Sequence, residues 1–328
     1  MNTETCNPPT ATDLSVIIGS YNTRDLLRGC LKSIYDNTRE CAFEVIVIDD
    51  CSTDDSPAMV RQEFPQVRLV CNTTNQRYAK VNNAGLRMAR GRYGLLLNSD
   101  VEVQPGAFDT LVRFMDEHPD AAAAGPKLIN PDGSIQHCIR SFPGLLPIVC
   151  QSLNVHKLLP GNRLTDQYYN TRFDYNRAQT VQSIGTTSFI LRRSTWERYG
   201  LLDERFTHFF VDLAYCFMLG QHRQPIYYVS DAVVLHYGSQ SINQAGLKEI
   251  RLLHEALADF YALCYAPRHR APTRMIIQAG IRLRKRLKML EYYLSSDKRV
   301  IKGPGAPALP GRKGGAGGPG AFRKRTDS

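Results

Sequence analysis

The chain of 328 residues is 43% hydrophobic and 22% charged, which predicts a globular protein with one large domain or one domain and a smaller appendage. Its net charge of +10 belongs to the C-terminal part, because residues 241–328 hold 18 Lys and Arg against 6 Asp and Glu, whereas residues 1–240 hold 23 against 25. This separation excludes a basic catalytic body and indicates that the C-terminus meets an anionic surface.

The start of the chain, residues 1–12, is expected to be disordered. It lacks the basic start and apolar middle of a secretory signal, and no later apolar run reaches the roughly 18–20 residues of a membrane span. The nine cysteines form no CxxC pair, which argues against a disulfide framework and a structural zinc site. We therefore expect a cytoplasmic protein.

Short apolar strands alternate with helices through the first hundred residues. Strands are predicted at 14–18, 44–48, 67–70 and 93–97, and helices after the first, second and third of them. This alternation predicts an α/β fold with a mostly parallel central sheet flanked by helices. Polar groups follow three of these strands, at Gly19–Asn22, Asp49–Asp50 and Asn98–Asp100. Ligands bind outside the carboxyl ends of such strands, so these groups are expected to share one crevice.

The rest of the chain is less regular. A helix is predicted from Pro105 to Glu117 and a strand at 121–125, but the Pro- and Gly-rich stretch to about residue 180 supports no assignment. A strand and a helix follow within 184–206, then one or two strands within 226–236 and helices over 240–295. We predict a catalytic domain at 13–240, a helical region at 241–300 and a disordered basic tail at 301–328.

Two residues at predicted strand ends can ligate a divalent cation. Asp100 closes the run LLLNSD, and a carboxylate there suits Mg²⁺ or Mn²⁺, which bind through one or two carboxylates and substrate phosphates. Capping of the next turn is the alternative role for Asp100. His236 follows the run VSDAVVL and is the second candidate ligand, with an ordinary hydrogen-bonded histidine as the alternative.

Two further acids are candidates for chemistry. Asp212 lies among aromatic and aliphatic residues in FFVDLAYC, where desolvation suits a general base, although it can also cap a helix. Asp49, at the end of IVID, can accept a hydrogen bond from a nucleobase imide or from a neighbouring loop.

Five segments in order resemble the family 2 inverting glycosyltransferases, which have the GT-A fold, and in particular their rhamnosyltransferase-like branch. The resemblance covers about residues 13–240. The segments are SVIIGSYNTRDLLRGCLKSI, EVIVIDDCSTDDS, NQRYAKVNNAGLRMARGRYGLLLNSD, GTTSFILRRSTWERYGLLDERF and YYVSDAVVLHYGSQS.

The resemblance implies a role for each matching residue. Asp212 would be the catalytic base, Gly185 would face the acceptor, and Asp100 with His236 would hold the divalent cation (Mg²⁺ or Mn²⁺). The implied nucleotide-sugar-binding residues are Gly19, Ser20, Tyr21, Asn22, Asp49, Arg77, Asn83, Asn98 and Ser99. Some members have an arginine at the position of Arg77, and many rhamnosyltransferase-like members have glycine there.

The sequence departs from the family pattern at four positions. Asn98 and Ser99 replace acids, and the family's Glu-Asp pair is Val211-Asp212 here, with Ala214 where a further Asp is usual. These losses leave an alternative function open: a catalytically impaired nucleotide-sugar- or membrane-binding protein on the same fold. A Rossmann-type oxidoreductase is disfavoured, because no GxGxxG follows the first strand.

The resemblance implies transfer of a sugar from a nucleotide-diphosphate donor to a hydroxyl of a cell-surface glycan or a polyprenyl-diphosphate-linked acceptor. The segment SIQHCIRSFPGLL is similar to rhamnosyltransferase-like members, so dTDP-rhamnose is the first donor candidate and a UDP-hexose the second.

The C-terminal helical region has an amphipathic, basic segment. Five apolar residues recur at helical spacing and several Lys and Arg lie near them, a pattern typical of a helix on an anionic membrane surface. The apolar residues are Ile276, Leu283, Leu287, Leu290 and Leu294. We expect a peripheral protein on the inner face of the cell membrane, and the alternative is a helix packed on the catalytic domain. No nucleic acid is expected, because no aromatic platform accompanies the charge.

Overall fold

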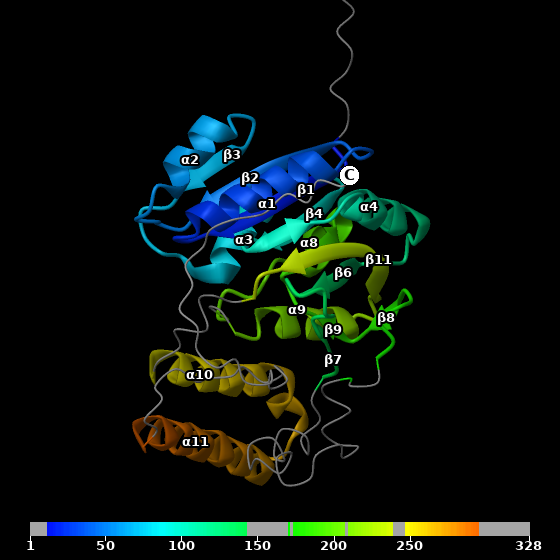
Figure 1. The fold of residues 1–328 in the computed structure, drawn as a ribbon. Helices are drawn as coiled ribbons and strands as arrows, with labels where there is room; N and C mark the ends of the chain where they lie inside the picture. Colours follow the sequence, from blue (N-terminus) through cyan, green and yellow to red (C-terminus); the bar gives the residue numbers. More distant parts are fainter. Residues whose placement is uncertain (1–11, 143–169, 171–172, 207–208, 239–246, 295–328) are drawn as a thin grey trace, which may run out of the picture.

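The central sheet is built from strands that alternate with helices along the chain (Figure 1). The computed structural model describes residues 12–142, 170, 173–206, 209–238 and 247–294. The first part contains β1 (Leu14–Ser20), α1 (Arg24–Asn37), β2 (Phe43–Asp49), α2 (Ser56–Glu63), β3 (Arg68–Cys71), α3 (Arg77–Met88), β4 (Tyr93–Asn98), β5 (Val101–Val103), α4 (Ala107–Glu117) and β6 (Ala123–Ile129). The second part contains β7 (Ile139–Arg140), β8 (Gln179–Val181), β9 (Ser183–Ile184), β10 (Ser188–Arg192), α8 (Arg193–Tyr199), α9 (Val211–Gln221), β11 (Ile226–His236), α10 (Leu247–Cys264), the 3₁₀ turn Ala266–Arg268 and α11 (Ala271–Leu294).

The described strands form one nine-stranded sheet and a small two-stranded one. The large sheet has the order β3-β2-β1-β4-β10-β6-β11-β5, and β8 pairs with β11. Strands β3, β2, β1 and β4 are parallel, and β6 and β11 run in the same direction, whereas β10, β5 and β8 run against them. The prediction of a mostly parallel α/β sheet with helices on both faces is confirmed.

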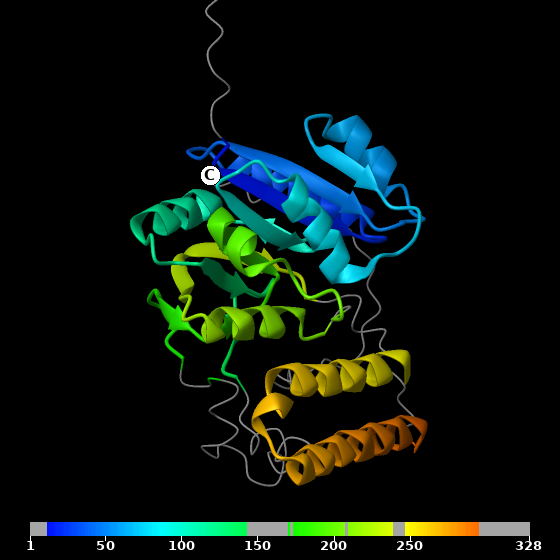
Figure 2. The same ribbon diagram turned by 180° about the vertical axis from the view of Figure 1, so that it is seen from behind.

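Both faces of the sheet are buried. Within β1, Val16 and Ile18 join the core beneath α1 and α4, whereas Ile17 joins the core beneath α3 and α9. Strand β4 alternates in the same way. Figures 1 and 2 show α1 and α3 on opposite sides of the sheet. Because side chains of a strand alternate between faces, a strand covered on both sides is an uninterrupted apolar run, as in Leu95–Leu97.

Helices α10 and α11 form a hairpin below α9, with α10 in the middle (Figures 1 and 2). Phe260 of α10 packs on Phe217 of α9 with ring centroids 6.2 Å apart. On its other side α10 packs on α11 through a small apolar cluster that includes Tyr261, Ile277 and Ile281. None of the described helices is long and apolar enough to cross a membrane.

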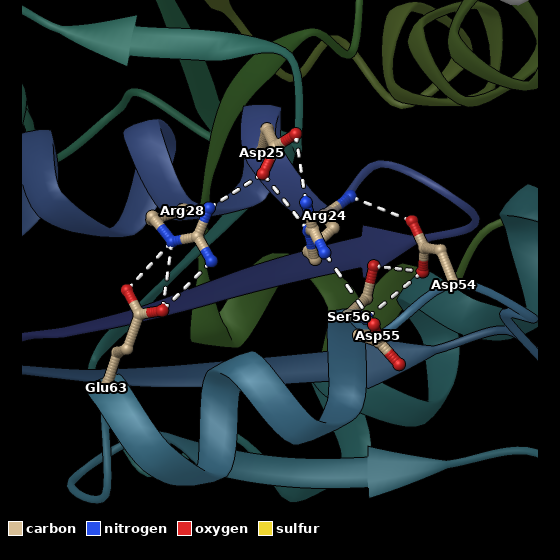
Figure 3. A network of polar contacts seen from close by, with 7 residues as sticks. All are labelled: Arg24, Asp25, Arg28, Asp54, Asp55, Ser56 and Glu63. Atoms are coloured by element: carbon tan, nitrogen blue, oxygen red, sulfur yellow. Dashed lines mark hydrogen bonds and ion pairs between the residues drawn. The ribbon is translucent and has the colours of Figure 1, made fainter.

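The starts of α1 and α2 are fixed to each other by a polar network (Figure 3). Asp54 accepts hydrogen bonds from the backbone N–H of Arg24 at 3.0 Å and of Ser56 at 3.1 Å. The Arg28 guanidinium makes a two-pronged ion pair with Glu63. Exposed ion pairs stabilise weakly. The main effect of the network is that Asp54 fixes the loop after β2 to the start of α1, while the Arg28–Glu63 pair connects α1 to the end of α2.

Several features differ from expectation. The strand predicted at 121–125 begins at Ala123, and β5 was not predicted because three residues are too few for a pattern. Strands β7 and β8 fall in or at the end of the stretch that supported no assignment, and β9, two residues long, follows it. The tail 301–328 and residues 1–11 of the expected N-terminal segment lie outside the described residues.

Candidate active site

Three polar strand ends meet at one edge of the sheet. In the parallel ladder, Gly19 is in register with Asn98 of β4, and Ser20 is in register with Asp49 of β2. The polar groups at the carboxyl ends of β1, β2 and β4 are therefore neighbours at one edge of the sheet. A chain of hydroxyls also crosses this edge, because Thr23 Oγ1 lies 3.0 Å from Ser20 Oγ and 2.9 Å from Ser99 Oγ.

Asp100 and His236 lie together at the end of β4. Strand β11 pairs antiparallel with β5, and the backbone N–H of Tyr237 donates to Asp100 O at 3.0 Å. This pairing places His236 Nε2 3.3 Å from Asp100 Oδ1, with both side chains largely buried. His236 Nδ1 lies 2.7 Å from Gln136 Oε1, and Nε2 is a buried atom without a hydrogen-bond partner.

The Asp100–His236 pair suits a divalent cation. A buried imidazole nitrogen without a hydrogen-bond partner beside a carboxylate oxygen gives two ligands on the same side. No group of three His, Cys, Asp or Glu residues that could hold a metal occurs in the described part of the chain. Two protein ligands nevertheless fit Mg²⁺ or Mn²⁺ bound to a diphosphate, since such ions take their other ligands from phosphate and water.

The two acids after β2 have different roles. Asp49 Oδ2 accepts from Ser52 N–H at 3.0 Å, but its Oδ1 is buried and has no hydrogen-bond partner. A buried acceptor without a donor is costly, so Oδ1 is available to a ligand N–H. Asp50 is instead occupied, because its carboxylate accepts from the backbone N–H groups of Gln76 and Arg77 at 2.7 and 3.0 Å.

The loop after β1 is tied to the loop after β2. Asn22 Oδ1 accepts from Thr53 N–H at 2.7 Å, and Asn22 N–H donates to Ser52 Oγ at 2.9 Å. Tyr21 next to it is 52% exposed, so its ring is free to contact a ligand. Gly19 has a packing role, because a Cβ there would lie 2.7 Å from Val81 of α3.

Three of the six non-glycine residues with positive φ in the described part of the chain lie near this edge of the sheet. Asn22, Cys51 and Arg77 have φ values of 53°, 69° and 72°, which side-chain-bearing residues seldom adopt, and Phe210 at the start of α9 has 64°. Such conformations persist only where neighbouring contacts hold them, and they concentrate at functional sites.

Replacing Arg77 with glycine is expected to stabilise the fold and weaken donor binding. Glycine relieves the left-handed strain at φ 72°, but it also loses more backbone entropy on folding than arginine does. The net expectation is that the free energy of unfolding rises by about 0.5–1 kcal/mol. The exposed guanidinium would no longer reach a nucleotide. Urea unfolding and calorimetric nucleotide titration measure the two effects. Lys80→Gly, within the same helix, is the control and is expected to destabilise by about 1 kcal/mol. Unchanged nucleotide affinity in Arg77→Gly would remove this residue from the donor site.

Asp212 lies at the start of α9, next to the segment 185–187. It is the second residue of the helix, and its Oδ1 accepts from Leu213 N–H at 2.8 Å. Asp212 Oδ2 lies 3.9 Å from the position of a Cβ on Gly185. Two residues further on, Thr187 O accepts from Asn98 N–H at 2.9 Å. This short segment therefore joins the acid of α9 to the strand that leads to Asp100.

Tyr78 holds the segment 185–187 through a hydrogen bond. Its hydroxyl donates to Thr186 O at 3.0 Å. Burial raises the pKa of the Tyr78 hydroxyl, and the charge of Asp212 raises it further, so this group remains a neutral donor. No local pattern indicated Tyr78 or Thr186, because their bond joins residues 108 positions apart.

Asn83 is bonded to the segment after α8 and not to the strand ends. Its side-chain amide donates to Leu202 O and Glu204 Oε1, both at 2.9 Å, and accepts from Leu202 N–H at 3.0 Å. These bonds use the amide fully and fix α3 to the turn before α9. We therefore assign Asn83 a structural role. Gly19, Ser20, Asp49 and Asn98 lie at the edge formed by β1, β2 and β4. Arg77, at the start of α3, is connected to this edge through its backbone bond to Asp50.

A mixed sheet of this order, with an acid after β4, a histidine at the end of β11 and an acid at the start of α9, is the arrangement of the GT-A fold. Solved structures of similar fold include GalNAc-T7 with UDP, GalNAc and Mn²⁺, at a TM-score of 0.54 and 14% identity over 89% of this chain and 59% of that one. They also include TarS of S. aureus, at 0.51 and 17% over 78% of this chain and 45% of that one.

The chain belongs to glycosyl transferase family 2, whose model matches residues 15–197, and it is thus a glycosyltransferase. A curated relative is the N-acetylglucosaminyl-diphospho-decaprenol L-rhamnosyltransferase of Mycobacterium tuberculosis, which is 27% identical over 88% of this chain and 97% of its own length. The O-antigen biosynthesis protein RfbC of Myxococcus xanthus is 29% identical over 59% of this chain and 15% of its own length.

Proposed function

We propose that the protein transfers a sugar, with inversion, from a nucleotide-diphosphate donor to a hydroxyl of a polyprenyl-diphosphate-linked or cell-envelope glycan acceptor. One observation carries this proposal: the segment 185–187 links Asp212 to the strand end that presents the Asp100–His236 pair. This link supports the proposal that an acid for the acceptor and ligands for the donor diphosphate act at one edge of the sheet.

The donor side follows from the strand ends. The free Oδ1 of Asp49 suits the imide N–H of uracil or thymine, and the hydroxyls of Ser20 and Ser99 suit ribose or phosphate oxygens. Rhamnose carried on dTDP is the first candidate, because the relative that spans nearly the whole chain is named as a rhamnosyltransferase. A UDP-hexose is the second.

The reaction proposed is a single in-line displacement at the anomeric carbon. Asp212 accepts the proton of the acceptor hydroxyl as the new glycosidic bond forms, an effect typically worth ~10²–10⁴-fold in rate. Asp100 and His236 would hold a divalent cation, which when bound supplies charge neutralisation to the departing nucleoside diphosphate. Gly185, beside Asp212, leaves room for the acceptor because it has no side chain.

A direct assay tests the transfer. The purified protein is incubated with Mn²⁺, with dTDP-rhamnose or a UDP-hexose, and with a short-chain polyprenyl diphosphate carrying N-acetylglucosamine. Formation of the extended glycolipid by mass spectrometry supports the proposal. Tight donor binding with neither transfer nor hydrolysis would favour the alternative, a catalytically impaired nucleotide-sugar-binding protein, to which the non-acidic Val211 and Ala214 point.

The exposed face of α11 fits an acceptor that is carried on a membrane lipid. Seven of the ten large apolar side chains exposed in the described part of the chain lie on this helix, and they are 53–77% exposed. They are Met275, Ile276, Leu283, Leu287, Leu290, Tyr293 and Leu294. The helix also carries six Lys or Arg and one Glu, and both Arg282 and Arg286 are exposed. We propose that this face lies on an anionic membrane surface.

Acidic substitutions on the outer face of α11 are expected to abolish vesicle binding. In the full chain, the double variant Leu287→Glu and Leu290→Glu removes apolar area and adds repulsion from anionic headgroups, while both side chains already face water. Cosedimentation with phosphatidylglycerol vesicles measures the effect. Leu263→Glu is the control, because Leu263 is an exposed leucine of α10. Equal pelleting of all three proteins would show that α11 does not contact the membrane.

A further inference from the structure

A turn after β6 holds the histidine of the Asp100–His236 pair. The chain reverses at Pro131–Gly133, and Gly133 has the left-handed φ of 80° that this turn needs. Gln136 N–H then donates to Leu128 O at 2.8 Å, which returns the chain alongside β6. Gln136 Oε1 lies 2.7 Å from His236 Nδ1, and no signal in the sequence connected these two residues.

The hydrogen bonds of the turn have one possible direction. The exposed Asp132 carboxylate, whose pKa is lowered by the Ser134 hydroxyl, can only accept, so Ser134 Oγ–H donates to it at 2.6 Å. Ser134 Oγ therefore accepts from Asn130 Nδ2 at 2.9 Å. Asn130 Oδ1, now an acceptor, takes a hydrogen bond from Gln136 Nε2 at 3.1 Å.

This direction fixes which nitrogen of His236 carries the proton. With its Nε2 used as a donor to Asn130, the Gln136 amide presents Oε1 to the ring, and Oε1 can only accept. The proton of the neutral imidazole therefore lies on Nδ1, and the Nε2 lone pair faces Asp100 Oδ1 at 3.3 Å. Two lone pairs facing each other without a hydrogen between them attract a cation.

We propose that Gln136 is a positioning residue that sets the tautomer of His236 for metal binding, with the turn Asn130–Ser134 setting the orientation of Gln136. This inference rests on the proposed function only in that the cation serves sugar transfer. It assigns a role to a segment that contacts neither donor nor acceptor in that proposal.

The tautomer is measured in the metal-free protein. The two imidazole nitrogens differ in ¹⁵N chemical shift according to which one is protonated, and His236→Asn identifies the signal among the eight histidines. The wild type is expected to have the proton on Nδ1. In Gln136→Leu the Nδ1–H has lost its acceptor, so a mixture with the proton on Nε2 is expected.

Mn²⁺ affinity without any sugar nucleotide is the second measurement. Gln136→Leu is expected to raise the Kd for Mn²⁺ by ~10–100-fold, the usual effect of losing a hydrogen-bond partner of a metal ligand. Gln136→Glu keeps an acceptor for Nδ1–H and is expected to restore both the tautomer and the affinity. Gln179→Leu is the control, because Gln179 makes a comparable amide bond, to Asp174 O at 2.8 Å, away from His236.

The two proposals fail separately. A wild type with the proton on Nε2, or a Gln136→Leu variant with unchanged tautomer and Mn²⁺ affinity, overturns the inference even where the wild type transfers sugar. The expected tautomer and affinity changes in a protein that transfers no sugar support the inference and remove the proposed function.

Discussion

The variant Asp212→Asn is expected to lose sugar transfer while it keeps donor binding. Asparagine has the same size, and its Oδ1 can still accept from Leu213 N–H, so the start of α9 is preserved. It cannot take the proton of the acceptor hydroxyl, and kcat should fall by ~10²–10⁴-fold. Initial rates of glycolipid formation measure the loss, and nucleotide titration measures the retained binding.

Asp259→Asn is the matched control for this variant, because Asp259 is an exposed acid of α10. Its rate should equal that of the wild type. Full activity in Asp212→Asn would disprove the assignment of the base. Lost activity together with lost donor binding would instead indicate that the segment 185–187 had moved and disturbed the edge at Asn98.

The variant Asp100→Ala is expected to abolish the metal-dependent part of donor binding. Asp100 supplies the carboxylate beside His236 Nε2, and one imidazole alone is a poor site for a hard cation that prefers oxygen. Loss of a residue that only hydrogen-bonds to a metal ligand raises the Kd by up to ~100-fold. Loss of the ligand Asp100 itself should therefore raise the Kd for Mn²⁺ by at least ~100-fold. Titration of dTDP or UDP with and without Mn²⁺ measures the effect.

Glu102→Ala is the control, because Glu102 follows Asp100 by two residues and accepts from Tyr237 Oη–H at 2.7 Å. Its Mn²⁺ dependence should remain that of the wild type. Asp100→Ala with the same Mn²⁺ dependence as the wild type would disprove the metal site, and Glu102→Ala with a lost dependence would move it to that residue.

The strands that carry the site were predictable because their environment is simple. A strand buried on both faces is an apolar run, and its end is marked by the first polar residues, as at Asp49 and Asn98. The approach of Asp100 to His236 was also predicted, because both residues follow apolar runs. The family resemblance supplied the pairing of Asp212 with this edge.

Other features depend on contacts between distant segments and left no local pattern. Asn83 was expected at the nucleotide, yet its partners lie 119 and 121 residues away at Leu202 and Glu204. Gln136 reaches His236 across 100 residues. A polar residue on a helix or turn has the same appearance in the sequence whether it bonds a ligand or a neighbouring segment, and only the fold separates the two cases.

The hydrogen bonds between Asn22 and the loop after β2 affect the expected rate of nucleotide binding. Because Asn22, Ser52 and Thr53 already bond to one another without a nucleotide, this part of the proposed donor site needs no ordering when a nucleotide binds. Capture of the nucleotide then loses little loop entropy, and its association rate should be governed by diffusion and not by a slow rearrangement.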